Sequence, residues 1–300
     1  AGLSTFLIKS PFTGTRFVWL FMGGVKVTIV PTESDFKLLI NVVLSESNKH
    51  QATYVESKVI ANANLFDEYM SDSFIRLDHN KNHVLNLSSN SLKELQNKFH
   101  KGLIKRNIKK ALKSNLFVTQ AESDKDIKIF YELEVLTRKK HGLPPQPYEF
   151  FKNMWDIFSQ ENMAVVLIAY EGSKPVASIF NVIFKDTMYY LYGGADYRFL
   201  KNRPNHLLLW KAIEMAYQQN LAYFDFGRTS SDHHGLLEFK RNWGTDEIDI
   251  SHFRFTKKSK PALLLNREIN LKSNRILKLT PKLPVSLLKF IGNCIYRHMG

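Results

Sequence analysis

Hydrophobic residues in this chain follow two spacings, every second residue and every third or fourth. The strand-like runs 164–170, 176–184 and 187–192 are separated by short turns, and the last is followed by Gly193-Gly194, which should end it. This pattern predicts a three-stranded antiparallel meander. A further alternating run, 245–256, is expected to close the same sheet.

The segment after the meander predicts a β-α-β unit. Leu207 and Ile213 recur at helical spacing after Pro204, which fits the first turn because that turn needs no N–H from it. The short run 223–226 follows. Because the crossover is short, strands 187–192 and 223–226 should be parallel neighbours with a right-handed connection. The pattern therefore favours an α/β (α+β) fold with helices covering a mixed sheet.

Two helices are expected before the meander. Asp124 can cap the first, which ends at the cations 138–140 before Gly142, as a helix C-terminus prefers. The second covers 148–158. The run 118–121 before them is expected to end a first domain.

The first 121 residues predict a separate set of elements. A capped helix follows 32–35, and Ser91 to Glu94 is a capping box. Strand-like runs lie at 17–20, 25–30, 54–56 and 83–87. We expect domains at 1–121 and 122–256, with the basic tail 257–300 packing back on the first domain.

The net charge of +14 indicates anionic partners and says nothing about the fold. Candidates are tRNA, coenzyme A, a nucleotide- or lipid-linked precursor and a membrane surface, and a generally basic surface is the alternative. The single cysteine, Cys294, excludes an internal disulfide and favours a reducing, cytoplasmic compartment. His233-His234 lacks the spacing of a zinc site, so no metal is expected. We identify neither a signal peptide nor the ~20 apolar residues that span a bilayer.

A basic helix is predicted after Gly102. Its outer face holds Arg106 and Lys109 among six cations between 101 and 113. Such a face is either solvated or a phosphate-binding face for tRNA or a pyrophosphate-linked acceptor.

Several motifs make the chain resemble the Fem family. These aminoacyl transferases contain two acetyltransferase-like (GNAT) domains and extend the peptide of cell-wall precursors. The resemblance implies two GNAT-like domains with mixed sheets flanked by helices, the first incomplete at its N-terminus. The motifs are YLYGGAD at 190–196, FDFGR at 224–228, Phe239-Lys240 with Trp243-Gly244, the basic helix at 103–116, and TRKKHGLPPQP at 137–147.

The resemblance also implies a catalytic group. It makes Lys240 the cation at the oxyanion of an acyl transfer or at the leaving ribose, with Phe239 beside it and Tyr192 as a hydroxyl partner in the same cleft. Asp225 ends the neighbouring strand and could orient Arg228 or accept a proton. A core tyrosine, a loop cap and a surface lysine are the structural alternatives for Tyr192, Asp225 and Lys240.

The donor loop departs from an ordinary acetyltransferase. Coenzyme A usually binds a loop R/Q-x-x-G-x-G/A at a helix N-terminus. This chain has no glycine there, although Arg198, Lys201 and Arg203 could still attract phosphate. The departure lowers the case for acetyl-CoA. Lys140 stands where Fem-type relatives have an arginine that helps to hold the nucleotide-linked acceptor, and lysine cannot bind phosphate in the same bidentate way.

Three functions stay open. The leading one is a Fem-like transferase that moves an aminoacyl or acyl group onto an amine of a cell-wall or polysaccharide precursor. It would act by direct attack, with no metal or tightly bound cofactor and with aminoacyl-tRNA or acyl-CoA as donor. The alternatives are an acyl-CoA-dependent N-acyltransferase of polysaccharide or lipid precursor synthesis, and a non-catalytic nucleic-acid-binding module. A cytoplasmic protein is expected, with peripheral contact at the inner face of the membrane as a further option.

Overall fold

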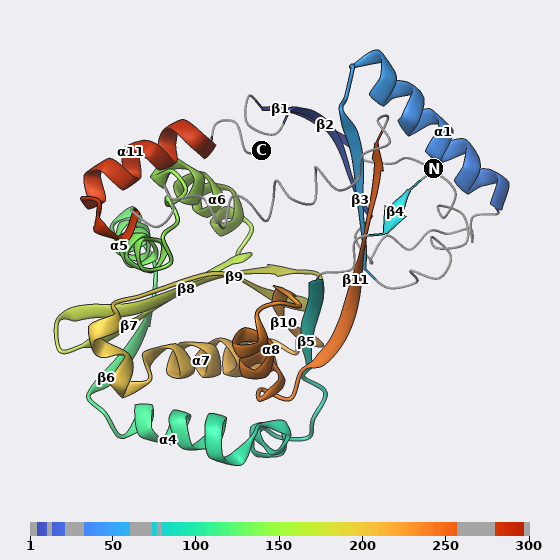
Figure 1. Cartoon of the computed structure of the whole chain (residues 1–300). Helices are drawn as coiled ribbons and strands as arrows, with labels where there is room; N and C mark the ends of the chain where they lie inside the picture. The colour runs from blue at the N-terminus through green and yellow to red at the C-terminus, as the bar shows by residue number, and fades with distance from the viewer. Residues whose placement is uncertain are drawn as a thin grey trace.

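The computed structural model describes residues 5–10, 14–21, 33–60, 74–76, 80–256 and 280–296 (Figure 1). Its strands are β1 (Thr5–Ser10), β2 (Gly14–Phe21), β3 (Tyr54–Ile60), β4 (Ile75–Arg76), β5 (Asn80–Asn86), β6 (Leu116–Gln120), β7 (Ala164–Glu171), β8 (Lys174–Phe184), β9 (Thr187–Ala195), β10 (Tyr223–Ser230) and β11 (Asp246–Thr256). Its main helices are α1 (Glu33–Lys49), α3 (Leu92–Leu95), α4 (Arg106–Leu112), α5 (Asp124–Lys140), α6 (Tyr148–Gln160), α7 (Pro204–Gln218), α8 (His234–Arg241) and α11 (Val285–Tyr296).

All strands belong to one mixed sheet, in the order β1-β2-β3-β11-β5-β10-β9-β8-β7-β6, with β4 beside β11. The predicted meander is confirmed, because β7, β8 and β9 pair antiparallel. The predicted parallel pair is also confirmed: Tyr223–Asp225 of β10 lie beside Thr187–Tyr189 of β9. Helices cover the sheet, so the α/β class holds.

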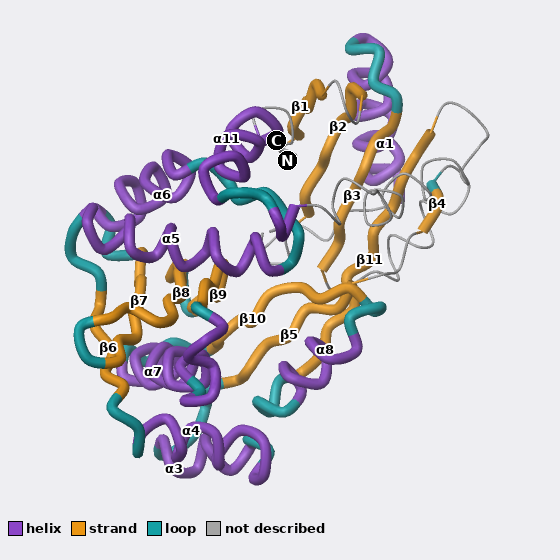
Figure 2. Tube along the Cα trace, turned by 60° about the vertical axis from the view of Figure 1, so that its left-hand side comes forward, coloured by secondary structure: helices purple, strands orange, loops and turns teal. Residues whose placement is uncertain are grey.

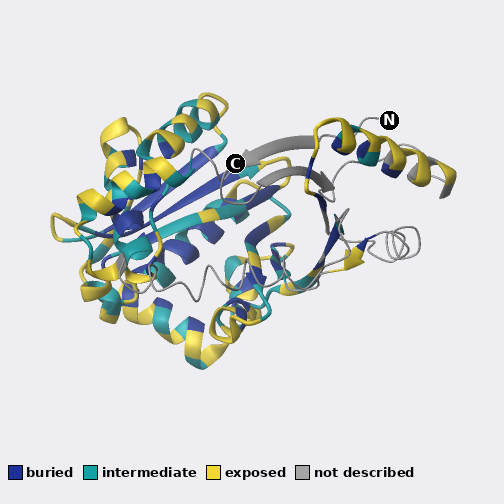
Figure 3. Cartoon of the chain, turned by 45° about the horizontal axis from the view of Figure 1, so that its top comes forward, coloured by how far each residue is buried: buried dark blue, intermediate teal, exposed yellow. Residues whose placement is uncertain are grey.

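The helices form two layers. Figures 1 and 2 show α5, α6 and α11 on one face of strands β7–β9, and α4 and α7 on the other. Leu208, Ile213 and Trp243 belong to the core under α7, while Phe130, Phe151 and Phe180 belong to the core under α5 and α6. Buried residues therefore gather along the strands and the inner helix faces (Figure 3).

Strand β5 lies at an unexpected place in the sheet. It pairs antiparallel with both β10 and β11, so β11 extends the sheet without touching β10. Leu85, Phe99 and Ile108 also join the core under α7. The division at residue 121 stays a prediction, but residues on its N-terminal side complete the core of the residues after it.

Two local expectations need correction, and two others stay predictions. Ser123, one residue before Asp124, is the N-cap of α5, because its hydroxyl and the Asp126 side chain form the capping box. Strand β9 runs through Gly193-Gly194 to Ala195, since both glycines keep antiparallel partners on β8. Helix α11 of the tail packs on α5, and the expected packing of the tail 257–300 on residues 1–121 stays a prediction. The predicted strand 25–30 lies outside the described residues.

Candidate functional site

Strands β9 and β10 part at the centre of the sheet. Their pairing ends at Tyr189 and Asp225, although β9 continues to Ala195 and β10 to Ser230. β10 is irregular there, because its register against β5 shifts between Asp225 and Arg228. Gly227 lies in the shift with a φ of 73°, a left-handed conformation that glycine adopts without strain. Backbone groups at the carboxyl end of β10 are therefore released from the β9–β10 ladder.

Lys240 reaches this irregularity from α8. The helix is anchored by Leu237, which is buried, and by Trp243 just after its end. The Lys240 side chain is only 4% exposed, and its Nζ donates hydrogen bonds to the carbonyl oxygens of Gly227 (2.8 Å) and Arg228 (3.2 Å). Burial lowers the pKa of Lys240 to about 8, with the nearby Asp225 carboxylate opposing that change. The lysine is therefore not an ordinary surface cation.

Asp225 fixes the same irregularity from within β10. Its Oδ1 accepts from the backbone N–H of Gly227 at 2.6 Å, and its Oδ2 accepts from Asn82 Nδ2 of β5 at 2.9 Å. Burial raises the pKa of this carboxyl group, while the two hydrogen bonds and Lys240 oppose the rise. The Arg228 side chain is exposed and forms no ion pair with Asp225 among the described residues. Asp225 thus shapes the loop that holds Lys240, and the expected contact with Arg228 is not formed.

Tyr192 lies on the other face of the sheet. Its ring makes edge-to-face contacts with Phe151 (centroids 5.0 Å apart) and Phe150 (6.0 Å), in the core under α5 and α6. Phe239, next to Lys240, packs instead against the core under α7. No hydrogen bond joins Tyr192 to Lys240 in the described part of the chain. The structure therefore brings Asp225 to Lys240 but places Tyr192 apart from them.

His83 is a neighbour of Lys240 that the sequence did not reveal. It is fully buried on β5, and its Nδ1 lies 3.3 Å from Thr245 Oγ1. Burial, and then the Lys240 charge, lower the pKa of His83 to about 4, so the imidazole is neutral at pH 7. The only sequence signal for His83 was the alternation along β5, which puts it on the same face of the strand as the core residue Leu85.

The predicted anion-binding residues are spread over three places. Arg198 forms a bidentate pair with Asp196 (2.9 and 2.6 Å), which already occupies much of its guanidinium. The other five are exposed: Arg203 is the N-cap of α7, Lys201 precedes it, Lys140 is the last residue of α5, and Arg106 and Lys109 lie on α4. Neither α4 cation forms an ion pair with any described residue.

A second buried charge, Glu134, lies on α5. Its side chain is on the inward face, four residues after Phe130, and the residue is 4% exposed. Its Oε2 is buried without a hydrogen-bond partner in the described structure. Burial raises the pKa of Glu134 to about 7, and Arg138 one turn later opposes that rise. The sequence signal for this residue was a carboxylate among the apolar residues of one helix face. We considered only the apolar residues of that face, so Glu134 was missed.

Comparisons with known proteins relate this chain to one family model, to a curated relative and to solved structures. Residues 98–241 match the family described as "Acetyltransferase (GNAT) domain". A 63-residue segment is 36% identical to the Lipid II:glycine glycyltransferase of Staphylococcus saprophyticus, covering 19% of this chain and only 15% of that protein. The crystal structure of FemX superposes with a TM-score of 0.68 at 16% identity, over 88% of this chain and 86% of FemX. Residues 98–241 therefore match a GNAT domain, and the chain resembles FemX in its fold.

The Fem-like fold extends to other solved structures. The C-terminal domain of a putative lysylphosphatidylglycerol synthetase from Agrobacterium fabrum superposes with a TM-score of 0.57 at 11% identity, over 90% of this chain and 89% of that domain. At such identities the likeness concerns the fold alone.

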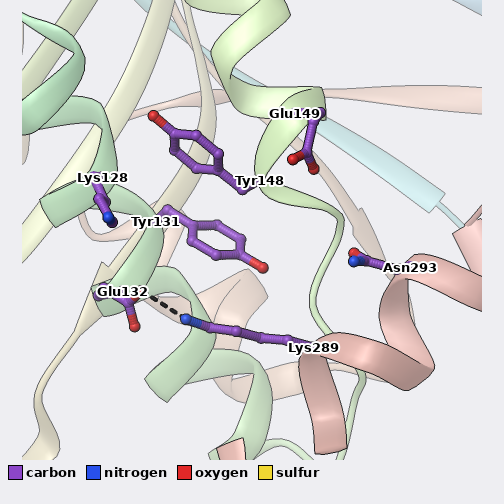
Figure 4. Close-up of a pocket in the computed structure, with 7 residues that line it drawn as sticks. All are labelled: Lys128, Tyr131, Glu132, Tyr148, Glu149, Lys289 and Asn293. Carbon is purple, nitrogen blue, oxygen red and sulfur yellow. Dashed lines mark hydrogen bonds and ion pairs between the residues drawn. The ribbon is translucent and has the colours of Figure 1, made fainter. Parts of the chain in front are cut away.

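The described part of the chain also bears on metal binding, membrane insertion and a further pocket. The described residues contain no group of three or more metal-ligating side chains, and none of their helices has both the length and the apolar character of a membrane span. A pocket of about 260 Å³ opens between α5, α6 and α11, where Lys289 Nζ lies 2.6 Å from Glu132 Oε1 (Figure 4). It contains none of the predicted site residues. The absence of metal from the reaction therefore stays a prediction.

Proposed function

We propose that this Fem-like protein transfers an aminoacyl or acyl group onto an amine of a cell-wall or polysaccharide precursor. The observation that carries the proposal is the buried Lys240 ammonium at the point where β9 and β10 part. Open α/β sheets place ligands at the carboxyl ends of such strands, where the neighbouring strand turns away. A fixed cation at that place suits a reaction that develops negative charge on oxygen.

Lys240 has one donor to spare. An ammonium group carries three N–H bonds, and two of them point to the carbonyl oxygens of Gly227 and Arg228. The third is available for the oxyanion that forms when an amine attacks the carbonyl carbon of the donor. Because the pKa of Lys240 is lowered to about 8, the same group can also give a proton to the departing oxygen or sulfur.

The remaining cations serve as anion contacts in this proposal. Lys201 and Arg203 before α7, with part of Arg198, would meet the phosphates of the donor, and Phe239 and Arg228 would line its path. The exposed cations of α4 and Lys140 would contact tRNA or the pyrophosphate of a lipid- or nucleotide-linked acceptor. Peripheral contact at the inner face of the membrane follows if the acceptor is lipid-linked.

The similarity to a Lipid II:glycine glycyltransferase supports an aminoacyl donor over an acyl thioester. The missing glycines of the donor loop point the same way, because Pro204 removes one backbone N–H from the start of α7. Aminoacyl-tRNA is therefore the first donor to test, with acyl-CoA second.

A single-turnover assay tests the proposal. A charged tRNA pool and a set of acyl-CoA thioesters would be offered with lipid- and nucleotide-linked precursors, using wild type, Lys240→Ala and the control Lys211→Ala. Lys211 is a half-exposed lysine of α7 that pairs with Glu214. We expect transfer by wild type and Lys211→Ala and a large loss in Lys240→Ala. Full transfer by Lys240→Ala, at unchanged folding, would remove Lys240 from the mechanism.

A further inference from the structure

Two buried hydrogen-bond acceptors without partners lie in one cluster beside β9. Glu134 Oε2 and Gln146 Oε1 are both enclosed and both lack a donor in the described structure. Tyr192 lies near both side chains. Burial, and then the Glu134 charge, raise the pKa of its hydroxyl, and a hydrogen bond with the Gln146 side chain opposes that rise. An unpaired buried acceptor is costly, and two in one place indicate a missing donor.

Rigid contacts hold this cluster in place. α5 touches β9 at Gly194, where an added Cβ would lie 2.3 Å from the backbone nitrogen of Glu134. One helical turn later, Thr137 Oγ1 accepts from the backbone N–H of Ala195 at 2.9 Å. Glu134 is therefore fixed directly over the end of β9 that has separated from β10.

The nearest cation to Glu134, Arg138, forms its hydrogen bonds with other groups. Arg138 on the same helix donates from Nε and Nη2 to the Pro144 carbonyl (both 3.2 Å) and from Nη2 to Tyr296 Oη of α11 (2.5 Å). Burial, and then the Glu134 charge, raise the pKa of Tyr190 and Tyr192 on β9, and both also raise the pKa of Tyr296 on α11. Arginine and tyrosine surround the carboxyl group, but its Oε2 receives no hydrogen bond from them.

We propose that Glu134, with Gln146 and the ring of Tyr192, binds an ammonium group of the acceptor on the α5 side of the sheet. This inference rests on the proposed transfer function and gives that group a place. Two acceptor oxygens suit an N–H donor and would repel a phosphate or carboxylate. An aromatic ring beside them adds attraction for an ammonium group. Tyr192 is the partly exposed member of the cluster, so the amine would meet it first.

Binding of a simple amine tests the inference without a donor. The dissociation constant of n-butylammonium chloride would be measured by calorimetry at pH 6 and pH 8, with tetramethylammonium as the cation that lacks N–H. Wild type should bind n-butylammonium roughly tenfold more tightly at pH 8, because Glu134 ionises across this range while the amine stays protonated. Glu134→Gln should bind it at least tenfold more weakly than wild type at pH 8, with no dependence on pH.

Glu132→Gln is the matched control, because Glu132 is a half-exposed carboxylate of the same helix that pairs with Lys289. It should bind like wild type. Equal binding by Glu134→Gln, or equal binding of tetramethylammonium, would overturn the inference. If Glu134→Gln unfolds, Glu134→Asp and Gln146→Ala are measured in its place. Wild-type affinity in both of these variants would also overturn the inference. Lys240→Ala should keep amine affinity, so failure of the transfer chemistry and failure of this amine site give different results.

Discussion

Lys240 and Glu134 are buried charges of opposite sign with different hydrogen-bond surroundings. Lys240, from α8, donates to two carbonyl oxygens at the irregularity of β10. Glu134, from α5, is equally buried but receives no hydrogen bond at Oε2. Burial shifts the pKa of each towards neutrality, to about 8 and about 7. Both groups can therefore exchange a proton near pH 7. Lys240 has two of its three N–H bonds paired, whereas Glu134 Oε2 has no partner among the described residues.

The two groups therefore differ in how far protein hydrogen bonds replace the water around them. A buried charge is tolerated when hydrogen bonds replace water, and the backbone of Gly227 and Arg228 does this for Lys240. Glu134 is held over β9 by the packing of α5 and by the hydrogen bond between Thr137 and Ala195, while its own Oε2 has no partner among the described residues. We therefore expect changes at Lys240 to act mainly on the chemical step, and changes at Glu134 to act on binding and on stability against pH.

The largest expected effect is on catalysis by Lys240. Lys240→Ala should lower single-turnover transfer by ~10²–10³, about 2.7–4 kcal/mol of transition-state stabilisation, because the oxyanion loses its fixed cation. Affinity for donor and acceptor should change much less, since that charge exists mainly in the transition state. Transfer rate, substrate affinity and melting temperature would be measured together. A loss explained entirely by unfolding would contradict the assignment.

The next effect concerns the pH dependence of stability at Glu134. Its pKa is about 7 in the folded chain and 4.5 ordinarily, so the folded state binds more protons between these values. Stability from this group is then fully present below pH 4.5 and is lost as pH rises through 7, by about 3 kcal/mol at 1.36 kcal/mol per pH unit. Glu134→Gln should therefore gain stability relative to wild type by that amount between pH 4.5 and pH 8.

Urea unfolding at several pH values would measure this difference. His83 and His206, each with a pKa lowered to about 4, change wild-type stability in the opposite direction over the same range. The variant must therefore be compared with wild type at each pH. A constant difference from pH 4.5 to pH 8 would show that Glu134 ionises normally.

A smaller effect is expected where α5 touches β9. Gly194→Ala would place a Cβ 2.3 Å from the backbone of Leu133 and Glu134, so α5 must move and stability should fall by about 2 kcal/mol. Gly235→Ala is the control, because its added Cβ meets nothing within 4 Å. Urea unfolding would compare the two variants. Similar stabilities would mean that α5 is not held by Gly194, and the fixed position of Glu134 would lose its support.

The smallest effect on stability is expected at α4. Reversing the charge of Arg106, Lys109 and Lys110 should change the free energy of unfolding by less than about 0.5 kcal/mol, since all three side chains are exposed. Binding to a tRNA pool should weaken and depend less steeply on salt, because fewer phosphate counterions are released. Unchanged affinity at low salt would return α4 to the role of a solvated face.

The sequence by itself determined the local elements after residue 80. Apolar runs separated by short turns indicated the meander, and helical spacing with a short crossover indicated the parallel neighbours β9 and β10. These features depend on periodicity and on nearby residues, which a linear pattern contains. The Lys240 position was also indicated, through its resemblance to the Fem family.

Only the tertiary structure decided which residues meet. The insertion of β5 between β10 and β11 joins Asn82 to Asp225, 143 residues apart in the chain. The same assembly places Tyr192 with Glu134, away from Lys240, because neighbouring side chains of a strand point to opposite faces and α5 and α8 cover different faces. Burial of Glu134 and Lys240, and hence their shifted pKa values, follows from packing between distant segments that no local spacing encodes.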